Sequence, residues 1–93
     1  MENIVIDGKV FSGIAAATPH TKVLLLVGKR GLLGCGYFST ATADKVGDAL
    51  AVVTGVGGFD DMLAARVKTV SAAAEALGVR VGMTGREALL LMA

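Results

Sequence analysis

Apolar and polar residues in the first forty positions follow the short, turn-bounded pattern that is typical of β-strands. The first two runs are separated by Asp7-Gly8, a dipeptide that strongly favours a two-residue hairpin turn. The segment KVLLLVG, residues 22–28, is apolar on both faces and therefore predicts a central strand. Because consecutive strands usually lie side by side, we expect an antiparallel meander. Its predicted strands span residues 3–6, 9–18, 22–28 and 32–38.

The middle of the chain predicts a short helix followed by a buried strand. Ser39 or Thr40 is a suitable N-cap for a helix that reaches Val46. Gly47 is suited to end that helix in the left-handed conformation. The next segment, ALAVVTGV at residues 49–56, is apolar and rich in β-branched residues, so it predicts a fifth strand.

Helical signals dominate the last third of the chain. A short helix over residues 61–65 is expected to be capped by Asp60, whose negative charge suits a helix N-terminus. The segment TVSAAAEALG, residues 69–78, carries the clearest helical spacing, and Gly78 closes it. A last helix is expected over residues 85–92. The residues with helical spacing in the clearest segment are Val70, Ala73, Ala74 and Leu77.

These elements predict an α+β domain over residues 1–93, with an antiparallel or mixed sheet of about five strands and helices packed on one face. Apolar residues make up 54% of the chain, charged residues make up only 18%, and the mean hydropathy is +0.68. A domain of 93 residues has little interior in which to bury so much apolar surface. We therefore expect part of that surface in a subunit interface, which predicts a homo-oligomer.

Composition also argues against several classes of function. The net charge is +1 and aromatic residues are 4%, whereas nucleic-acid binding favours basic surfaces and aromatic platforms. The apolar runs are much shorter than the roughly 20 residues of a membrane span. With Cys35 and His20 as the only residues of their types, neither a disulfide nor a metal site is expected, and no cofactor is predicted. The single cysteine and the lack of a signal-peptide pattern predict a cytoplasmic protein.

Cys35 is the candidate nucleophile of the chain, since a thiolate is a strong nucleophile when a base or cation activates it. A turn at residues 29–31 would place Cys35 opposite Leu25. His20 would then lie about 17 Å away along the ladder, too far for a Cys–His pair within one chain. The alternative is a small apolar side chain buried in the sheet, which is common for free cysteine.

Glycines on either side of Cys35 indicate a close approach to that strand. Gly34 and Gly36 share the opposite face from Cys35, and glycine within a strand usually marks such an approach. The Ala-rich helix at residues 69–77 is one candidate for the approaching group. A ligand lying over the sheet is the other.

The segment GVGGFDDM resembles a phosphate-binding loop only superficially, because it lacks the spacing of known phosphate motifs. Asp60 and Asp61 would also repel a phosphate. Paired aspartates can bind a metal or act in acid–base catalysis, but no further ligand is evident, so helix capping is the favoured interpretation. His20 follows Pro19 and is expected to be a solvated loop residue.

The segment GMTGREALLLM, residues 82–92, combines a helix start with a run of leucines. Thr84 and Glu87 have the spacing of a capping box, and the leucines are expected to dock on the sheet or on a neighbouring subunit. Capping leaves Arg86 without a role, so its guanidinium is free to hold a carboxylate. Thr84, Gly85 and Arg86 are therefore candidate ligand-binding residues, with a carboxylate of the chain or of a partner subunit as the alternatives.

Residues 67–90, VKTVSAAAEALGVRVGMTGREALL, resemble the characteristic end of the YunC-like family, the domain of unknown function 1805. The likeness is strongest in the octapeptide at residues 82–89, and it extends more loosely to Cys35-Gly36 and residues 60–63. It departs from the family at Gly57-Gly58, where bulkier or polar residues are expected. The resemblance implies a compact α+β domain of bacterial or archaeal type and transfers no activity.

Three functions remain open from the sequence. The first is a homo-oligomer that binds a small acidic ligand or a partner near residues 82–87. The second is a small cysteine-dependent enzyme that uses Cys35. The third is a structural subunit of a larger complex. Whether Arg86 and Cys35 share a cavity is the observation that best separates them.

Overall fold

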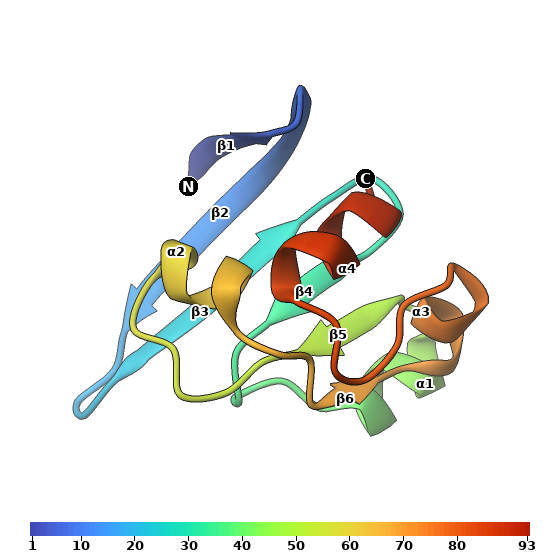
Figure 1. Ribbon diagram of the computed structural model, residues 1–93. Helices are drawn as coiled ribbons and strands as arrows, with labels where there is room; N and C mark the ends of the chain where they lie inside the picture. The colour runs from blue at the N-terminus through green and yellow to red at the C-terminus, as the bar shows by residue number, and fades with distance from the viewer.

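Six strands and four helices make up the chain in a computed structural model that describes residues 1–93 (Figure 1). The strands are β1 (Glu2–Ile6), β2 (Lys9–Ala17), β3 (Lys22–Val27), β4 (Leu32–Gly34), β5 (Leu50–Val52) and β6 (Thr69–Val70). The helices are α1 (Thr40–Val46), α2 (Phe59–Ala64), α3 (Ala72–Ala76) and α4 (Gly85–Leu91).

All six strands form one sheet in the order β1-β2-β3-β4-β5-β6. Strands β1 to β4 pair antiparallel in sequence order, which confirms the predicted meander. Strand β5 runs parallel to β4, and β6 runs antiparallel to β5. The predicted α+β class with a mixed sheet is therefore confirmed, with six strands in place of about five. The extra strand is β6, which the sequence pattern had merged with the helix that follows it.

The β1–β2 hairpin turns as its dipeptide predicts. Asp7 has φ 50° and Gly8 has φ 77°, so both central residues are left-handed, as a type I′ turn requires. Aspartate and glycine tolerate this conformation better than other residues. Local sequence therefore determines this hairpin.

The β3–β4 turn corrects the predicted pairing of Cys35. The Gly28 N–H donates to the Gly31 carbonyl at 2.8 Å, so the turn has two central residues, and three had been expected. Gly34 consequently lies opposite Leu25, and the Cys35 N–H donates to the carbonyl of Leu24 at 3.0 Å. Because successive residues point to opposite faces, this shift of one position turns Cys35 to the other face from Leu25.

Strands β4 and β5 are shorter than the predicted strands 32–38 and 49–56. Beyond Gly34 the chain reverses in a turn in which the Phe38 N–H donates to the Cys35 carbonyl at 3.1 Å. The chain then crosses to α1 before it returns as β5, because a parallel pair needs a crossover connection.

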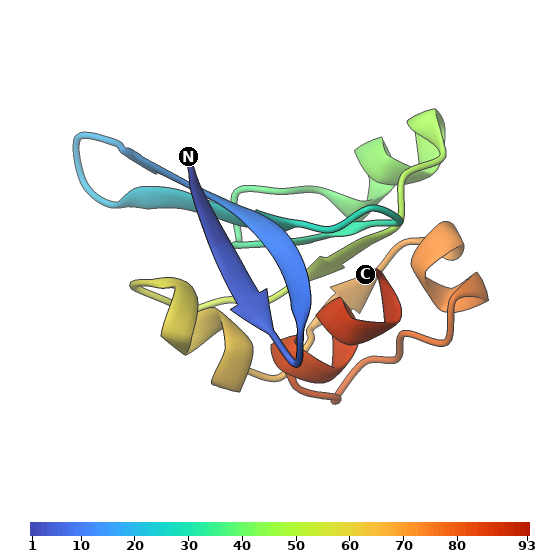
Figure 2. The same cartoon turned by 90° about the horizontal axis from the view of Figure 1, so that it is seen from above.

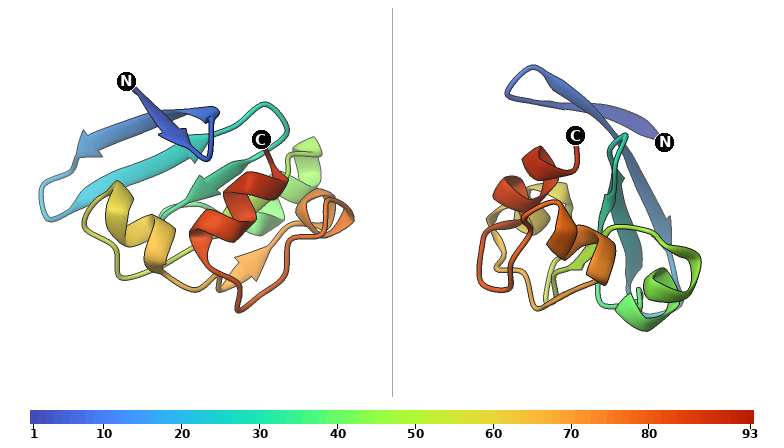
Figure 3. Two further views of the ribbon diagram at one scale, coloured as in Figure 1. Left: turned by 45° about the horizontal axis from the view of Figure 1, so that its top comes forward. Right: turned by 90° about the vertical axis from the view of Figure 1, so that its right-hand side faces the viewer.

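The helices lie on both sides of the sheet, which differs from the predicted single face. Helices α2, α3 and α4 cover one face, and α1 lies on the other (Figures 2 and 3). The main core includes side chains from all three helices on the first face. A separate small cluster joins Ala43 of α1 to Leu50 and Val52 of β5. The alternation of strand residues between two faces explains why β5 serves both clusters.

Side-chain caps define the starts of α1 and α3, whereas α2 starts without one. The Ser39 hydroxyl accepts from the Thr42 N–H, and Gly47 ends α1 with φ 83°, as predicted. The predicted Asp60 cap is wrong, because α2 begins earlier, with Gly58 at the N-cap position and no side-chain hydrogen bond. Phe59 packs against the main core and draws that position into the helix. Asp60 instead lies in the first turn, where its charge suits the helix dipole.

Two close approaches explain glycines that the sequence left ambiguous. A Cβ at Gly34 would lie 2.6 Å from Cδ2 of Phe38, so Phe38 is the group that approaches this strand, and the expected helix 69–77 is not. A Cβ at Gly85 would lie 2.0 Å from the carbonyl oxygen of Met62, so α4 can approach α2 only with glycine there. In α4 the buried Leu89 and the following Met92 are fully enclosed, which confirms that the C-terminal helix docks on its own sheet.

None of the helices combines the length and the apolar content that are needed to cross a membrane.

Candidate cavity at Cys35

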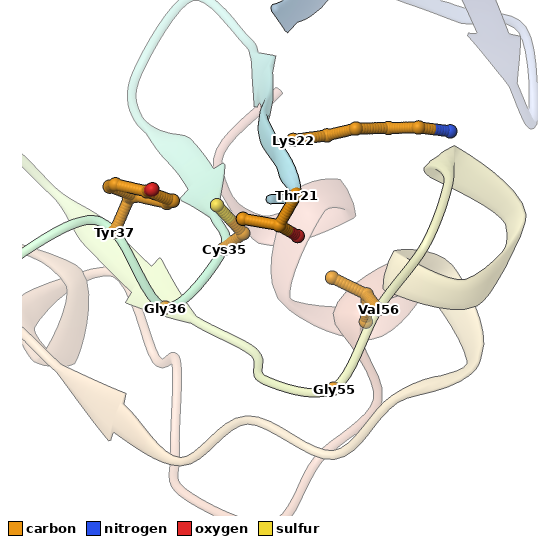
Figure 4. Close-up of a pocket in the computed structure, with 7 residues that line it drawn as sticks. All are labelled: Thr21, Lys22, Cys35, Gly36, Tyr37, Gly55 and Val56. Carbon is orange, nitrogen blue, oxygen red and sulfur yellow. The ribbon is translucent and has the colours of Figure 1, made fainter. Parts of the chain in front are cut away.

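The cavity that we take as the candidate site lies at the end of β4, between the β2–β3 turn and the loop that follows β5 (Figure 4). Its volume is about 390 Å³, which falls within the range of small-molecule sites. Three separate parts of the chain meet there. The lining residues are Thr21, Lys22, Cys35, Gly36, Tyr37, Gly55 and Val56.

Two turns shape the wall of the cavity. The turn that begins at Cys35 exposes Gly36 and Tyr37, and Tyr37 is 60% exposed. Gly55 has φ 71°, a left-handed conformation that glycine adopts without strain. It redirects the chain after β5, so that Val56 lies across the cavity from Tyr37 (Figure 4).

The Cys35 side chain forms part of the cavity wall although the residue is only 6% exposed. Its sulfur accepts a hydrogen bond from the Leu24 N–H at 3.4 Å. Figure 4 shows the sulfur directed toward the space between Thr21 and Tyr37. Cys35 is therefore a buried side chain of the sheet, as one interpretation of the sequence expects. Its thiol also borders the cavity, as a nucleophile would need to.

Backbone N–H groups around the cavity have no acceptor within the chain. These are the N–H groups of Gly36, Tyr37, Gly55 and Val56, which lie outside every helix and strand and donate to neither backbone nor side-chain atoms. Gly36, Tyr37 and Gly55 are exposed and Val56 is half-buried, so these donors are accessible to a molecule that enters the cavity. Several free donors around one cavity provide hydrogen bonds for a carbonyl or carboxylate oxygen.

Lys22 is the only lining residue with a charged side chain, and no aspartate or glutamate lines the cavity. Its ammonium group donates to the Gly57 carbonyl at 3.3 Å. Figure 4 shows the side chain extending from the rim toward the loop before α2. Lys22 thus supplies the one charged group among the lining residues, and its ammonium group is held at Gly57.

His20 lies beside Thr21 in the exposed β2–β3 turn but does not line the cavity. Asp61 is used locally, since its carboxylate accepts from the Gly57 N–H at 3.0 Å. No three side chains of the types that bind metals come together anywhere in the chain.

The start of α4 forms the predicted capping box. The Thr84 hydroxyl accepts from the Glu87 N–H at 3.2 Å, and the Glu87 carboxylate accepts from the Thr84 N–H at 2.9 Å. The Thr84 hydroxyl also donates to that carboxylate at 3.0 Å. The hydrogen bond from the Thr84 backbone, then that from its hydroxyl, and to a smaller extent the charge of Arg66 lower the pKa of Glu87 below 4.5.

Arg86 pairs with Asp7, which lies in the turn of the β1–β2 hairpin. The side chains are 48% and 56% exposed, respectively. Arg86 therefore meets a carboxylate of its own chain, one of the alternatives that the sequence left open. Thr84, Gly85 and Arg86 do not border the cavity, so the structure separates them from Cys35.

Sequence reasoning missed most of the cavity wall. Thr21, Tyr37 and Val56 belong to no motif, and they meet only because the sheet brings distant turns together. The available signal was the glycine content of the two turns, at Gly36 and Gly55.

A mixed six-stranded sheet, with three helices on one face and α1 on the other, defines this molecule as a small α+β protein with a cavity at one end of the sheet. The chain belongs to the family described as Domain of unknown function (DUF1805), whose model matches residues 34–92. The resemblance to the YunC-like family is thereby confirmed.

Two relatives cover nearly the whole chain. The uncharacterized protein YunC of Bacillus subtilis (strain 168) is 34% identical over 93 residues, which cover 96% of this chain and 92% of that protein. The crystal structure of a protein of unknown function from Thermoplasma acidophilum is similar with a TM-score of 0.94 at 33% identity. That similarity covers 99% of this chain and 90% of the other.

Proposed function

We propose that this protein binds a small molecule carrying a carboxylate in the cavity at Cys35. The observation that carries the proposal is the set of free backbone N–H groups at Gly36, Tyr37, Gly55 and Val56 around one cavity. Unpaired donors of this kind favour an oxygen acceptor, and a charged acceptor forms the stronger hydrogen bond.

Charge and apolar surface support the same class of ligand. Lys22 is the one charged lining residue and is a cation, and no acidic side chain lines the cavity to repel an anion. Tyr37 and Val56 offer apolar surface on opposite sides for the rest of the ligand. This combination of apolar walls and a few polar groups is usual for small-molecule sites.

This proposal puts the acidic ligand at a different place from the one that the sequence favoured. At residues 82–87 a ligand would have to displace Asp7 from Arg86 and compete with the capping box for its donors. The cavity at Cys35 requires neither exchange. A purely structural subunit predicts no cavity, so the cavity favours binding over that alternative. The cytoplasmic location stays a prediction.

Titration of the ¹⁵N-labelled protein with benzoate, succinate and pyruvate tests the proposal, with the corresponding amides as uncharged controls. We expect the amide resonances of Gly36, Tyr37, Gly55 and Val56 to shift with at least one carboxylate and much less with its amide. Lys22→Gln should weaken that binding by about fivefold, or roughly 1 kcal/mol. Resonances that remain unchanged with all three acids, or that respond equally to the amides, would contradict the proposal.

A matched pair of variants locates the binding. Val56→Phe should fill part of the cavity and abolish the shifts, whereas Val81→Phe should leave them intact, because Val81 is 62% exposed and does not line the cavity. Circular dichroism confirms that both variants are folded. Binding that survives Val56→Phe would place the ligand elsewhere.

A cysteine-dependent enzyme is the second candidate, because the thiol of Cys35 borders the cavity beside free N–H donors. Such donors can stabilise an oxyanion that forms when a thiolate adds to a carbonyl carbon. This function requires a thiolate at neutral pH, so the rate of alkylation by iodoacetamide distinguishes it from binding alone. Rapid alkylation well below pH 8 would favour the enzyme, and an inert thiol in the folded protein would remove it.

A further inference from the structure

The face of the sheet that carries α1 is only partly covered. Helix α1 packs over β4 and β5, and no helix lies over β1, β2 and β3 on that side (Figure 3). We call the outward-facing residues of β1 to β4 beside α1 the bare face. The strand pairing assigns to it Asn3, Val5, Val10, Ser12, Ile14, Ala16, Val23, Leu25, Val27 and Leu32. Two of these are partly packed already, Val23 against the main core and Leu32 against the cluster under α1.

The bare face has no ionisable side chain. Asn3 and Ser12 are its only polar residues. Val5 and Val10 lie directly opposite one another and are 64% and 59% exposed. The charged strand residues Glu2, Lys9 and Lys22 all point to the other face. An uncharged apolar face of this kind is typical of the centre of a homodimer interface.

Helix α1 forms a wall along one side of the bare face. A groove of about 340 Å³ runs at its foot, and Leu32 of the bare face is part of that groove. Tyr37 and Val46 border the groove and are 60% and 69% exposed. On its opposite side α1 is already engaged, because the Asp44 carboxylate accepts from the Ala72 N–H at 2.8 Å. The unengaged side of α1 therefore adjoins the bare face. The groove between them is mostly apolar, with Ser39, Thr42 and Asp48 as its polar residues.

We propose that two copies of this chain pack their bare faces together around a two-fold axis, with the α1 wall of each copy against the partner. The bare face has no charges, so it can meet its own copy without bringing like charges together, as an isologous interface requires. The sheets would lie about 10 Å apart, the usual spacing of face-to-face sheets. Apolar side chains of each copy would then enter the groove of the other.

Area explains why the α1 wall must take part. Four strands spaced by ~4.8 Å and about 17–20 Å long project roughly 350 Å². A standard interface buries about 800 Å² on each partner. The bare face alone therefore provides about half, and the surface around Tyr37 and Val46 is the adjoining apolar area that can extend it. Because Tyr37 also lines the cavity at Cys35, the partner would border the proposed ligand site.

Sedimentation velocity between about 1 and 100 μM tests the interface. We expect a dimer of twice the 9.4 kDa chain mass. Leu25→Lys, at the centre of the bare face, and Val46→Glu, on the wall, should each raise the dimer dissociation constant at least tenfold. Val81→Glu is the matched control, because Val81 is 62% exposed and lies outside both surfaces, and it should leave the dissociation constant unchanged.

Val46→Glu keeps the test decisive even where Leu25→Lys disturbs folding, because Val46 is solvent-exposed in the single chain. A wild-type chain that stays monomeric at 100 μM overturns the proposal, as does an assembly larger than a dimer. A dimer that survives Val46→Glu with wild-type affinity, or that is lost in Val81→Glu, assigns the interface to another face. If the chain is a monomer that still binds carboxylates, the dimer proposal fails and the ligand-site proposal stands. The two proposals can therefore be tested separately.

Discussion

The start of α4 and the rim of the cavity at Cys35 are both glycine-containing turns. They differ in how many of their backbone N–H groups have an acceptor within the chain. At α4 the N–H groups of Thr84, Gly85 and Glu87 all donate to atoms of the chain. At the cavity, Gly36 and Gly55 each leave an N–H group without an acceptor. The start of α4 leaves only the Arg86 N–H without an acceptor, whereas the rim of the cavity leaves four N–H groups that another molecule can use.

The start of α4 shows that a conspicuous sequence motif can serve mainly to build and seat a helix. GMTGRE combines glycine, threonine, arginine and glutamate, and the structure uses most of these groups to start one helix and to seat it closely on α2. The segment around Cys35 has no comparable motif. What distinguishes that segment is its unpaired backbone N–H groups, which only the structure reveals.

The largest expected effect contrasts the two turns sterically. Gly85→Ala places a Cβ 2.0 Å from the Met62 carbonyl oxygen, whereas Gly36→Ala meets only Cγ2 of Thr54 at 3.6 Å. Overpacking costs about 1–3 kcal/mol, and a backbone contact cannot move aside as a side chain does, so Gly85→Ala should cost at least roughly 3 kcal/mol. Gly36→Ala should change stability by less than about 0.5 kcal/mol. Urea unfolding followed by circular dichroism measures both, and equal effects would remove the contrast.

A smaller effect is expected from the capping box. Thr84→Ala removes the hydroxyl that accepts from the Glu87 N–H, which should cost about 1 kcal/mol. Thr54→Ala is the control, because Thr54 is exposed and makes no side-chain hydrogen bond within the chain. Thermal unfolding should give a midpoint several degrees lower for Thr84→Ala only. Equal midpoints for both variants would show that the box contributes no net stability.

The lowered pKa of Glu87 predicts a pH dependence at the same helix start. Because the folded-state pKa lies below the usual value of 4.5, the ionised carboxylate stabilises the fold above that pH. This contribution is lost as the pH falls through the folded-state pKa. Glu87→Gln should therefore lose less stability between about pH 6 and pH 3 than the wild type in urea unfolding. An unchanged acid dependence would show that other carboxylates dominate it.

The smallest effect is expected at the Arg86–Asp7 pair. Both side chains are about half exposed, and exposed ion pairs contribute about 0–1 kcal/mol. A double-mutant cycle of Arg86→Gln and Asp7→Asn should give a coupling energy of about 0.5 kcal/mol that decreases with salt. A much larger or salt-independent coupling would mean that the pair does more than an exposed contact can.

Much of the fold could be predicted because its signals are local. The type I′ turn depends on two adjacent residues, Asp7 and Gly8, and the capping box on two residues of one helical turn. The meander follows from runs of apolar residues joined by short turns. Element boundaries were harder to predict where two elements share one apolar run. For example, the sequence pattern predicted β6 and α3 as a single helix.

The candidate site could be predicted only at Cys35 itself. Its register depends on whether the β3–β4 turn has two or three central residues, and residues 28–32 are compatible with both. A one-residue difference decides which face of the sheet receives the thiol. The other walls of the cavity come from turns that are distant in the chain, so no local sequence pattern predicts that they meet.

The sequence by itself determined the α+β class, the order of the meander and the caps of α1 and α4, because each depends on residues only a few positions apart. Only the tertiary structure decided what Arg86 meets, because Asp7 lies 79 positions away in the chain. It also decided which donors at Cys35 stay unpaired and which side of the sheet stays bare. These features depend on how distant segments of the chain pack together. The local sequence allows several different contacts at each place, and the packing of the whole chain decides which one forms.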